Sequence, residues 1–332
     1  MKSFEPSLGA WNAWQDRDVK LRIGVSSCLL GEQVRFDGGH KRSRFVVDQL
    51  GEWVEFVPVC PEVEIGMGIP RPTIRIEEAD GELRLVAPKT GNDFTKQMLA
   101  FSKKRVRGLR QEGLDGYILK KGSPSCGPFR LPVYKNKHPI RRDGVGFFAA
   151  ALREFWPQLP IEDEGRLNDH GIRESFIEQI FVRNRWRSLR ERGLTRGRLV
   201  EFHTAHKLLL RAHNEAGYRR AGSVVGQAGK IPNKQLFADY EAELQATMQT
   251  RSTPQRHRNV LEHAMGYLKK LLEPAEKAQI LGAIKDYANG LLPLIVPITL
   301  LRYNIKKHDV EYLRGQLYFD PHPKELMLRN HS

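Results

Sequence analysis

Three cysteines could do chemistry in this 332-residue chain, and each of them follows a short apolar run. They are Cys28, Cys60 and Cys126, and the runs span residues 21–26, 54–59 and 114–119. Apolar, β-branched runs that end in turn residues are typical of buried strands. The carboxyl ends of neighbouring parallel strands share one edge of the sheet, and open α/β sheets bind ligands at that edge. The sequence therefore predicts that the three thiols converge on one cavity.

Several kinds of site contain cysteine thiols. A purely structural role is one alternative, because free cysteine is among the most buried residue types. Structural zinc favours closely paired cysteines and four ligands, which three separated cysteines do not supply. Nucleophilic catalysis needs one thiol with a base and leaves the other two unexplained. An iron-sulfur cluster on three thiolates fits the set best, and it leaves one iron open as a Lewis acid.

A carboxylate and several hydroxyl groups accompany the cysteines. Glu62 lies two residues after the second cysteine. Ser27 precedes the first cysteine, and Ser123 and Ser125 precede the third. Hydroxyl groups can donate hydrogen bonds to the sulfur atoms of a cluster and so tune it. We expect Glu62 to transfer protons, and the alternative is that it satisfies the free amides of a helix N-terminus.

The chain carries a formal net charge of +15, which favours polyanionic partners such as nucleotides and RNA. The positive charge is densest between Arg183 and Arg220. The alternative reading of such a run is a solvated helix face. His203, His206 and His213 recur within the same segment at helical spacing, but no acidic or cysteine partner completes a zinc pattern. We therefore expect structural or phosphate-contacting histidines.

The pattern of apolar residues in the sequence changes near residue 168. From 20 to 168, short strand-like runs alternate with helical stretches at 41–50 and 92–112, which is typical of βαβ units. From 169 to 332, apolar residues recur at helical spacing. The sequence predicts an N-terminal arm (1–19), a Rossmann-like α/β domain with a mostly parallel sheet (20–168) and an all-α domain (169–332). The acidic, proline-containing segment 157–169 is interpreted as a linker.

The cellular compartment is predicted from what the sequence lacks. No apolar stretch reaches the roughly 20 residues that a membrane span needs, and the first residues do not form a secretion signal. Because the chain also has few cysteines, we expect a cytoplasmic protein with reduced thiols and no membrane partner.

The residues around the cysteines resemble the three motifs of the 2-thiouracil desulfurase family. The motifs read Ser27-Cys28-Leu-Leu-Gly31, Val59-Cys60-Pro-Glu62 and Gly122-Ser-Pro-Ser-Cys126-Gly127, in the family's order. The resemblance covers roughly residues 20–168. It implies a 4Fe-4S cluster on the three cysteines, with a free iron that takes sulfur from a thiolated nucleobase. It also implies that Glu62 and Ser123 are catalytic.

The helical part resembles an uncharacterised bacterial domain that is often fused behind desulfurase domains. This fusion is similar to proteins that desulfurate 4-thiouridine 5′-monophosphate rather than the free base. The expected reaction is a hydrolysis to uridine monophosphate and hydrogen sulfide without net redox change. Candidate substrate contacts are Ser27, Arg35, Lys121, Ser125, Lys207, Arg211 and Arg219. The alternative function is a non-catalytic or redox iron-sulfur protein that binds RNA through its basic helical domain.

Overall fold

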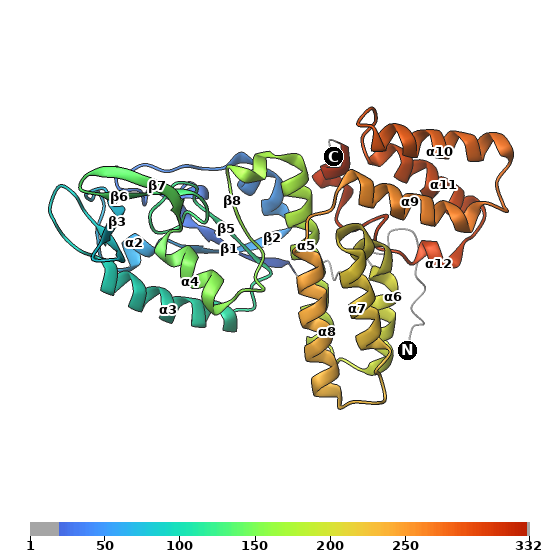
Figure 1. The fold of residues 1–332 in the computed structure, drawn as a ribbon, viewed down its shortest axis with the longest axis horizontal. Coiled ribbons are helices and arrows are strands. Elements are labelled where there is room, and N and C mark those ends of the chain that lie inside the picture. Colours follow the sequence, from blue (N-terminus) through green and yellow to red (C-terminus); the bar gives the residue numbers. More distant parts are fainter. Residues whose placement is uncertain (1–19, 331–332) are drawn as a thin grey trace. The chain divides into compact units, whose positions relative to one another are not determined.

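The structure is a computed structural model that describes residues 20–330 (Figure 1). The predicted N-terminal arm, residues 1–19, lies outside the described residues. The described chain divides into two compact units, Lys20–Asn168 and 169–330. The first unit contains all the strands named here, and the second unit is helical. The predicted fold class, an α/β domain followed by an all-α domain, is confirmed.

The first unit is built on a four-stranded parallel sheet with the order β2-β1-β5-β8. Its strands are β1 (Leu21–Ser26), β2 (Val54–Val59), β5 (Gly116–Leu119) and β8 (Ile161–Asp163). Ser26 at the end of β1 pairs with Val59 at the end of β2, and Val25 pairs with Ile118 of β5. The carboxyl ends of the three cysteine-bearing strands therefore meet at one edge of the sheet.

Two helices cover one face of this sheet. They are α3 (Thr95–Gln111) and α4 (Phe147–Phe155), which lie side by side beneath the strands (Figure 1). Tyr117 of β5 packs edge-on against Phe148 of α4, with ring centroids 5.8 Å apart. The ring fits against the neighbouring strand β1 only because position 24 has no side chain. A Cβ at Gly24 would lie 2.2 Å from a Tyr117 ring carbon. A glycine in the middle of β1 therefore makes room for the core.

A second four-stranded sheet, with the order β4-β3-β6-β7, completes the first unit. Its strands are β3 (Arg75–Ala79), β4 (Glu82–Val86), β6 (Leu131–Lys135) and β7 (His138–Gly144). It consists of two antiparallel hairpins joined by a parallel pairing of β3 with β6. Asp80 and Gly81 form the first hairpin turn, both at positive φ. This sheet shares its core with Met98 of α3 and Phe147 of α4.

Two local predictions are wrong. The segment 157–169 is not a linker, because it contributes the fourth strand of the parallel sheet, β8, which pairs with β5. The acidic residues are neutralised there: Lys120 pairs with Glu164, and Arg166 pairs with Glu162. The predicted helix at 41–50 shrinks to one π-helical turn at Phe45–Gln49 followed by a 3-10 turn.

The second unit consists of helices packed around their own core. The helices are α5 (His170–Glu191), α6 (Arg196–His213), α7 (Glu215–Val225), α8 (Asn233–Met248), α9 (Pro254–Leu268), α10 (Pro274–Ala288), α11 (Ile295–Lys307) and α12 (Glu311–Arg314). Trp186, Phe202 and Tyr240 form an aromatic cluster within this core. Among the described residues, none of the helices combines the length and apolar character that crossing a membrane requires.

Candidate functional site

The three cysteines line one cavity of about 320 Å³ in the first unit. Cys28 lies in the 3-10 turn η1 (Ser27–Leu29) directly after β1. Cys60 is the N-cap of the short helix α2 (Pro61–Glu64) directly after β2. Cys126 lies in the loop that follows β5. The strand-end positions thus bring together three thiols that are 32 and 66 residues apart in the sequence.

Part of the cavity wall comes from the second sheet and the segment before it. Ile76 of β3 and Leu131 and Tyr134 of β6 line it with apolar surface, and Arg75 stacks over the Tyr134 ring at 4.8 Å. Apolar walls with a few polar groups are typical of small-molecule sites, and a volume near 300 Å³ is at the small end of their range. The cavity therefore suits a ligand of the size of a base or a mononucleotide.

The loop that carries Cys126 is held against the N-terminus of α4. The first-turn amides of Phe147 and Phe148 donate to the carbonyl oxygens of Pro124 and Ser125 at 3.1 and 2.9 Å. These are amides that a helix leaves without intrahelical partners. A close approach is needed for these bonds, and Gly146 allows it because it has no Cβ. The position of the third thiol is therefore fixed by backbone hydrogen bonds.

Burial keeps the three thiols in their protonated form as long as no cation is bound. Burial raises the pKa of Cys28 to about 11 and raises that of Cys60 as well. Burial raises the pKa of Cys126 well above its usual range, against a smaller opposing effect of the Ser26 hydroxyl. Each ionised thiol would also raise the pKa of its neighbours. Three thiolates in this cavity therefore require a bound positive centre, which is the role of a metal or cluster.

Glu62 projects into the same cavity, where both of its carboxylate oxygens have partners. The Arg71 guanidinium donates to Oε2 through Nε at 2.8 Å, and its Nη2 lies 2.7 Å from the same oxygen. On the other side, Oε1 accepts a hydrogen bond from the Ser125 hydroxyl at 2.9 Å, and the Ser123 hydroxyl lies 3.4 Å away. The prediction that Glu62 and Ser123 lie beside the cysteines agrees with this geometry.

The two serines of the third motif have different positions. The Ser123 hydroxyl lines the cavity and accepts the backbone N–H groups of Ser125 and Cys126 at 3.2 and 3.1 Å. It therefore closes the turn that carries the thiol. Ser125 is fully buried and is not part of the cavity lining. Direct contact between Ser125 and a substrate, as predicted from the sequence, is not supported by this position, and its structural partner is Glu62.

The remaining predicted contacts of the first unit lie around the cavity. Ser27 is buried in its lining, and Arg35 and Lys121 contribute cationic side chains. The Arg35 side chain is 21% exposed and pairs with Asp37 through Nε at 3.3 Å. The residue that sequence reasoning missed is Arg71. Nothing in the local pattern signals it, because its partner Glu62 is nine residues away across an irregular loop.

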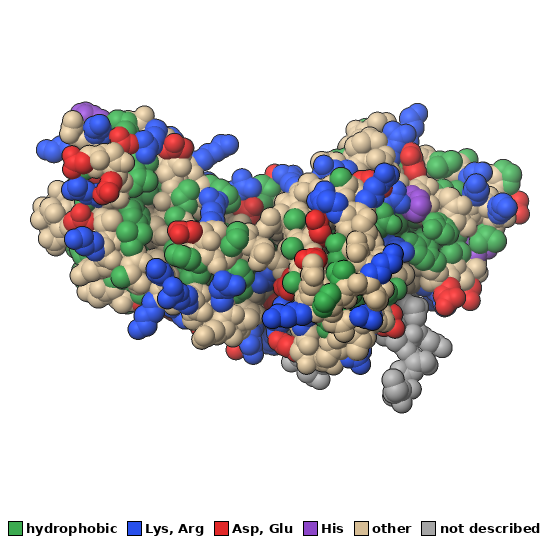
Figure 2. Space-filling model, turned by 60° about the horizontal axis from the view of Figure 1, so that its bottom comes forward, with side chains coloured by type: hydrophobic (Ala, Val, Ile, Leu, Met, Phe, Trp, Pro, Cys, Tyr) green, Lys and Arg blue, Asp and Glu red, His purple; other side chains and the backbone are tan. Residues whose placement is uncertain are grey.

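Several arginines in the basic run of the second unit pair with acidic side chains. Arg211 and Arg219 both bind Glu215, at 2.7 and 3.2 Å, and Lys207 belongs to the same helix α6 as Arg211. Further pairs are Arg187 with Glu191, Arg190 with Glu241 and Arg220 with Glu243. On the face of this unit shown in Figure 2, Asp and Glu side chains are interspersed among the Lys and Arg side chains. These pairs favour the reading as a solvated helix face. Phosphate binding by Lys207, Arg211 and Arg219 stays a prediction.

The histidines of the second unit occupy structural positions. His203 lies 3.2 Å from the Tyr240 hydroxyl, and His206 lies 2.7 Å from the Phe202 carbonyl oxygen. His213 bridges Glu178 and the Thr250 carbonyl oxygen, both at 2.8 Å. Buried polar groups are normally hydrogen-bonded in this way. The expectation of structural histidines therefore agrees with their surroundings.

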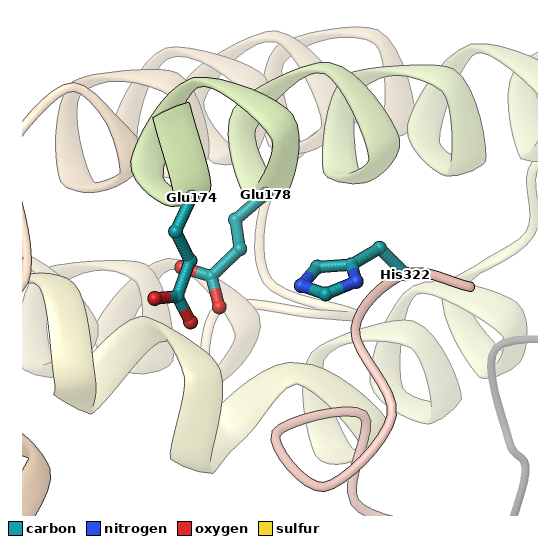
Figure 3. Close-up of side chains that lie close together, drawn as sticks. All are labelled: Glu174, Glu178 and His322. Atoms are coloured by element: carbon teal, nitrogen blue, oxygen red, sulfur yellow. The ribbon is translucent and has the colours of Figure 1, made fainter. Parts of the chain in front are cut away.

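A second group of metal-ligand types occurs in the core of this unit. Glu174 and Glu178 of α5 project toward His322, with potential ligand atoms within 4.8 Å of one another (Figure 3). The buried Arg329 guanidinium already pairs with both carboxylates, at 3.1 and 3.0 Å. Since this cation pairs with both carboxylates and His213 also contacts Glu178, the group is better explained as a buried ion-pair network.

Comparison with known proteins agrees with this division of the chain. A family described as 2-thiouracil desulfurase matches residues 23–164, and a family described as a protein of unknown function (DUF1722) matches residues 207–323. The chain is 29% identical over 158 residues to the uncharacterized protein YbgA of Escherichia coli (strain K12). This match covers 47% of the chain and 94% of YbgA.

Two further relatives are similar to the chain. The uncharacterized protein YbbK of Bacillus subtilis (strain 168) is 32% identical over 153 residues, which cover 44% of the chain and 98% of YbbK. A solved structure described as a 4Fe-4S-dependent thiouracil desulfidase, TudS, is 32% identical. It covers 45% of the chain and 95% of TudS, with a TM-score of 0.38. The chain belongs to the 2-thiouracil desulfurase family and carries a DUF1722 region after its desulfurase domain.

Proposed function

We propose that the protein removes sulfur from thiolated pyrimidines with the help of a 4Fe-4S cluster held by Cys28, Cys60 and Cys126. One observation carries this proposal: the three thiols and the Glu62 carboxylate line a single cavity of small-molecule size. Family membership over residues 23–164 supports the same reaction class. No other cysteine occurs in the chain, so the protein offers three thiolates and one open position.

The donor set fits such a cluster chemically. Cubane clusters are held by thiolates, and the three thiols, of which Cys28 and Cys126 are buried and Cys60 is half-buried, need a positive centre in order to ionise. When bound, the cluster supplies a Lewis-acidic iron with an affinity for soft thiocarbonyl sulfur. Cys28 and Cys60 follow adjacent strands, and Cys126 is held by the hydrogen bonds between its loop and α4. The chain thus supplies ligands whose backbone positions are fixed in advance.

Glu62 and Ser123 are proposed to move the protons of the reaction. Hydrolysis of a thiocarbonyl adds the oxygen of water to the ring carbon and releases hydrogen sulfide, so no electrons are gained or lost. Glu62 would accept a proton from the attacking water and return it to the ring nitrogen, whose own proton leaves with the second proton of water on the sulfur as hydrogen sulfide. Its Oε1 is the oxygen for this role, because Oε2 already faces two guanidinium N–H groups of Arg71. The Ser123 hydroxyl, at the cavity surface, would hold the water or a substrate carbonyl.

The proposed substrate is 4-thiouridine 5′-monophosphate, with uridine monophosphate as the product. Arg35 and Lys121 in the cavity lining are cations that suit a phosphate dianion. Lys207, Arg211 and Arg219 of the second unit remain proposed additional contacts. An RNA-binding role of the helical unit is less well supported, because basic residues such as Arg190, Arg211 and Arg220 already pair with acidic groups.

Turnover by protein reconstituted without oxygen tests the proposed function. The product uridine monophosphate and the released sulfide are both measured, with 4-thiouridine monophosphate, 4-thiouridine and 4-thiouracil as substrates. We expect equimolar sulfide and desulfurated product without an added reductant. A requirement for electrons, or no turnover of any thiolated pyrimidine by protein with four irons per chain, contradicts the proposal.

A further inference from the structure

The Glu62 carboxylate is bound from two sides by side chains that are themselves hydrogen-bonded to different segments of the chain. Arg71 binds Oε2, and Ser125 binds Oε1. The Arg71 side chain is only 3% exposed and that of Glu62 is 13% exposed. An ion pair with so little solvent contact is screened much less than a surface pair, and breaking it by removing one partner is costly.

Arg71 also donates to three backbone carbonyl oxygens. Its Nη1 donates to the Gly68 carbonyl oxygen at 3.1 Å, and its Nη2 donates to the Val34 carbonyl oxygen at 2.8 Å. Its backbone N–H donates to the Phe36 carbonyl oxygen at 2.9 Å. Arg71 therefore ties the carboxylate to the segment 34–36, which lines the same cavity and includes Arg35. The planar guanidinium is suited to this, because it offers five donors in a fixed arrangement.

Ser125 holds the opposite oxygen from a fully buried position. Its hydroxyl donates to Oε1, while its carbonyl oxygen accepts the first-turn amide of Phe148 at 2.9 Å. The serine is thus attached to the rigid N-terminus of α4. With both oxygens bonded to fixed groups, rotation of the carboxylate would break hydrogen bonds on both sides.

We propose that Arg71 is a positioning residue, which together with Ser125 fixes the orientation of the Glu62 carboxylate so that Oε1 is presented beside the cavity hydroxyl of Ser123. This inference rests on the proposed function, in which Glu62 transfers protons. Orientation matters for such a group, since displacement of a reacting atom by about 1 Å can cost on the order of 10²-fold in rate.

The kinetic test compares R71M and R71K with a matched control in cluster-loaded protein. The control is R105M, because Arg105 forms an ion pair with Glu64, which lies on the same short helix as Glu62, and not with Glu62 itself. We expect R71M to lower kcat by about 10- to 100-fold with KM changed less than about threefold and with iron content unchanged. R71K should recover part of kcat, and R105M should retain it. A kcat within twofold of wild type in R71M, or a loss of kcat that only follows a loss of iron, overturns the inference.

A second test does not use activity and therefore separates this inference from the proposed function. The melting temperatures of metal-free wild type, R71M, E62Q and the double variant are compared. R71M leaves a carboxylate without its cation in a nearly buried position, so adding E62Q to R71M should raise the melting temperature. If E62Q instead lowers it equally in both backgrounds, Arg71 does not hold this carboxylate. If wild type does not desulfurate thiolated pyrimidines but E62Q raises the melting temperature of R71M, the proposed function is wrong and the role of Arg71 in holding the Glu62 carboxylate is supported.

Discussion

Gly146 lies against Ser125 so closely that a Cβ at position 146 would be 2.5 Å from the Ser125 carbonyl oxygen. Gly146 is the N-cap of α4, with φ −61° and ψ 144°, which any residue can adopt. Position 146 therefore requires glycine because a side chain does not fit there, and not because of its backbone conformation. The contact allows the first turn of α4 to hold the loop that carries Cys126, and it connects the core of the domain with the site.

Replacing Gly146 by alanine should displace the Cys126 loop. We expect G146A to be destabilised by about 1–3 kcal/mol, as overpacked sites are, and to retain less iron. The matched control is G108A in α3, where a Cβ would meet only the end of the Arg105 side chain, at 3.9 Å. Alanine there should stabilise the helix by up to about 1 kcal/mol. Calorimetry and iron analysis check both variants, and equal effects of the two would contradict the steric account.

The buried ion pairs of Arg329 should contribute strongly to the stability of the helical unit. R329M leaves Glu174 and Glu178 without this cation in the protein interior, and such a loss costs about 3–5 kcal/mol. R258M is the control, because Arg258 pairs with Glu262 on an exposed helix face, where pairs contribute about 0–1 kcal/mol. Chemical denaturation measures the difference. Similar losses in the free energy of unfolding of both variants would contradict a strong contribution of the buried ion pairs to stability.

Acidification should destabilise the helical unit through its buried histidines. Burial, together with the nearby Lys207, lowers the pKa of His203 to about 4 from its usual 6.5. Between these pH values the unfolded chain binds more protons than the folded chain, so stability is full above pH 6.5 and falls as the pH decreases toward 4. The shift corresponds to at most about 3 kcal/mol. H203Q should therefore lose fewer degrees of melting temperature than wild type between pH 7 and pH 4, and an equal loss would argue against this origin.

The cations at the cavity should distinguish phosphorylated from unphosphorylated substrates. R35Q and K121Q remove positive charge from the cavity lining without touching the cysteines. We expect either variant to raise KM for 4-thiouridine monophosphate about tenfold while KM for 4-thiouracil changes little, since bonds to charged groups contribute about 1.5–3 kcal/mol. Steady-state kinetics with the two substrates provides the comparison. A parallel rise of both KM values would show that these residues do not bind the phosphate.

The elements that could be predicted correctly are those whose own residues show a clear pattern. The runs that end at Cys28 and Cys60 are continuous, apolar and followed by turn residues, and they form adjacent parallel strands. The strand β8 was missed because it is three residues long and contains Glu162 and Asp163, whose residue types are depleted in strands. Glu164, directly after β8, pairs with Lys120 from a distant segment, and a local pattern cannot show such a partner.

In the candidate site, too, some residues could be predicted from the sequence and others could not. Glu62 was predicted from its position beside a cysteine, whereas Arg71 emerged only from the structure, because an irregular loop folds its guanidinium back onto the carboxylate. Charge counting likewise drew attention to the arginine run of the second unit. It could not show that residues such as Arg211 and Arg219 already share an acidic partner, Glu215.

The iron content of single cysteine variants tests the central claim most directly. Wild type, C28A, C60A and C126A are reconstituted without oxygen, and iron, sulfide and the visible spectrum are measured for each. The account predicts about four irons per chain and a brown wild-type protein, with loss of the cluster in all three variants. S102A, a buried polar position in α3 that does not line the cavity, is the control and should keep its iron. Full iron retention in the three cysteine variants would contradict the cluster assignment.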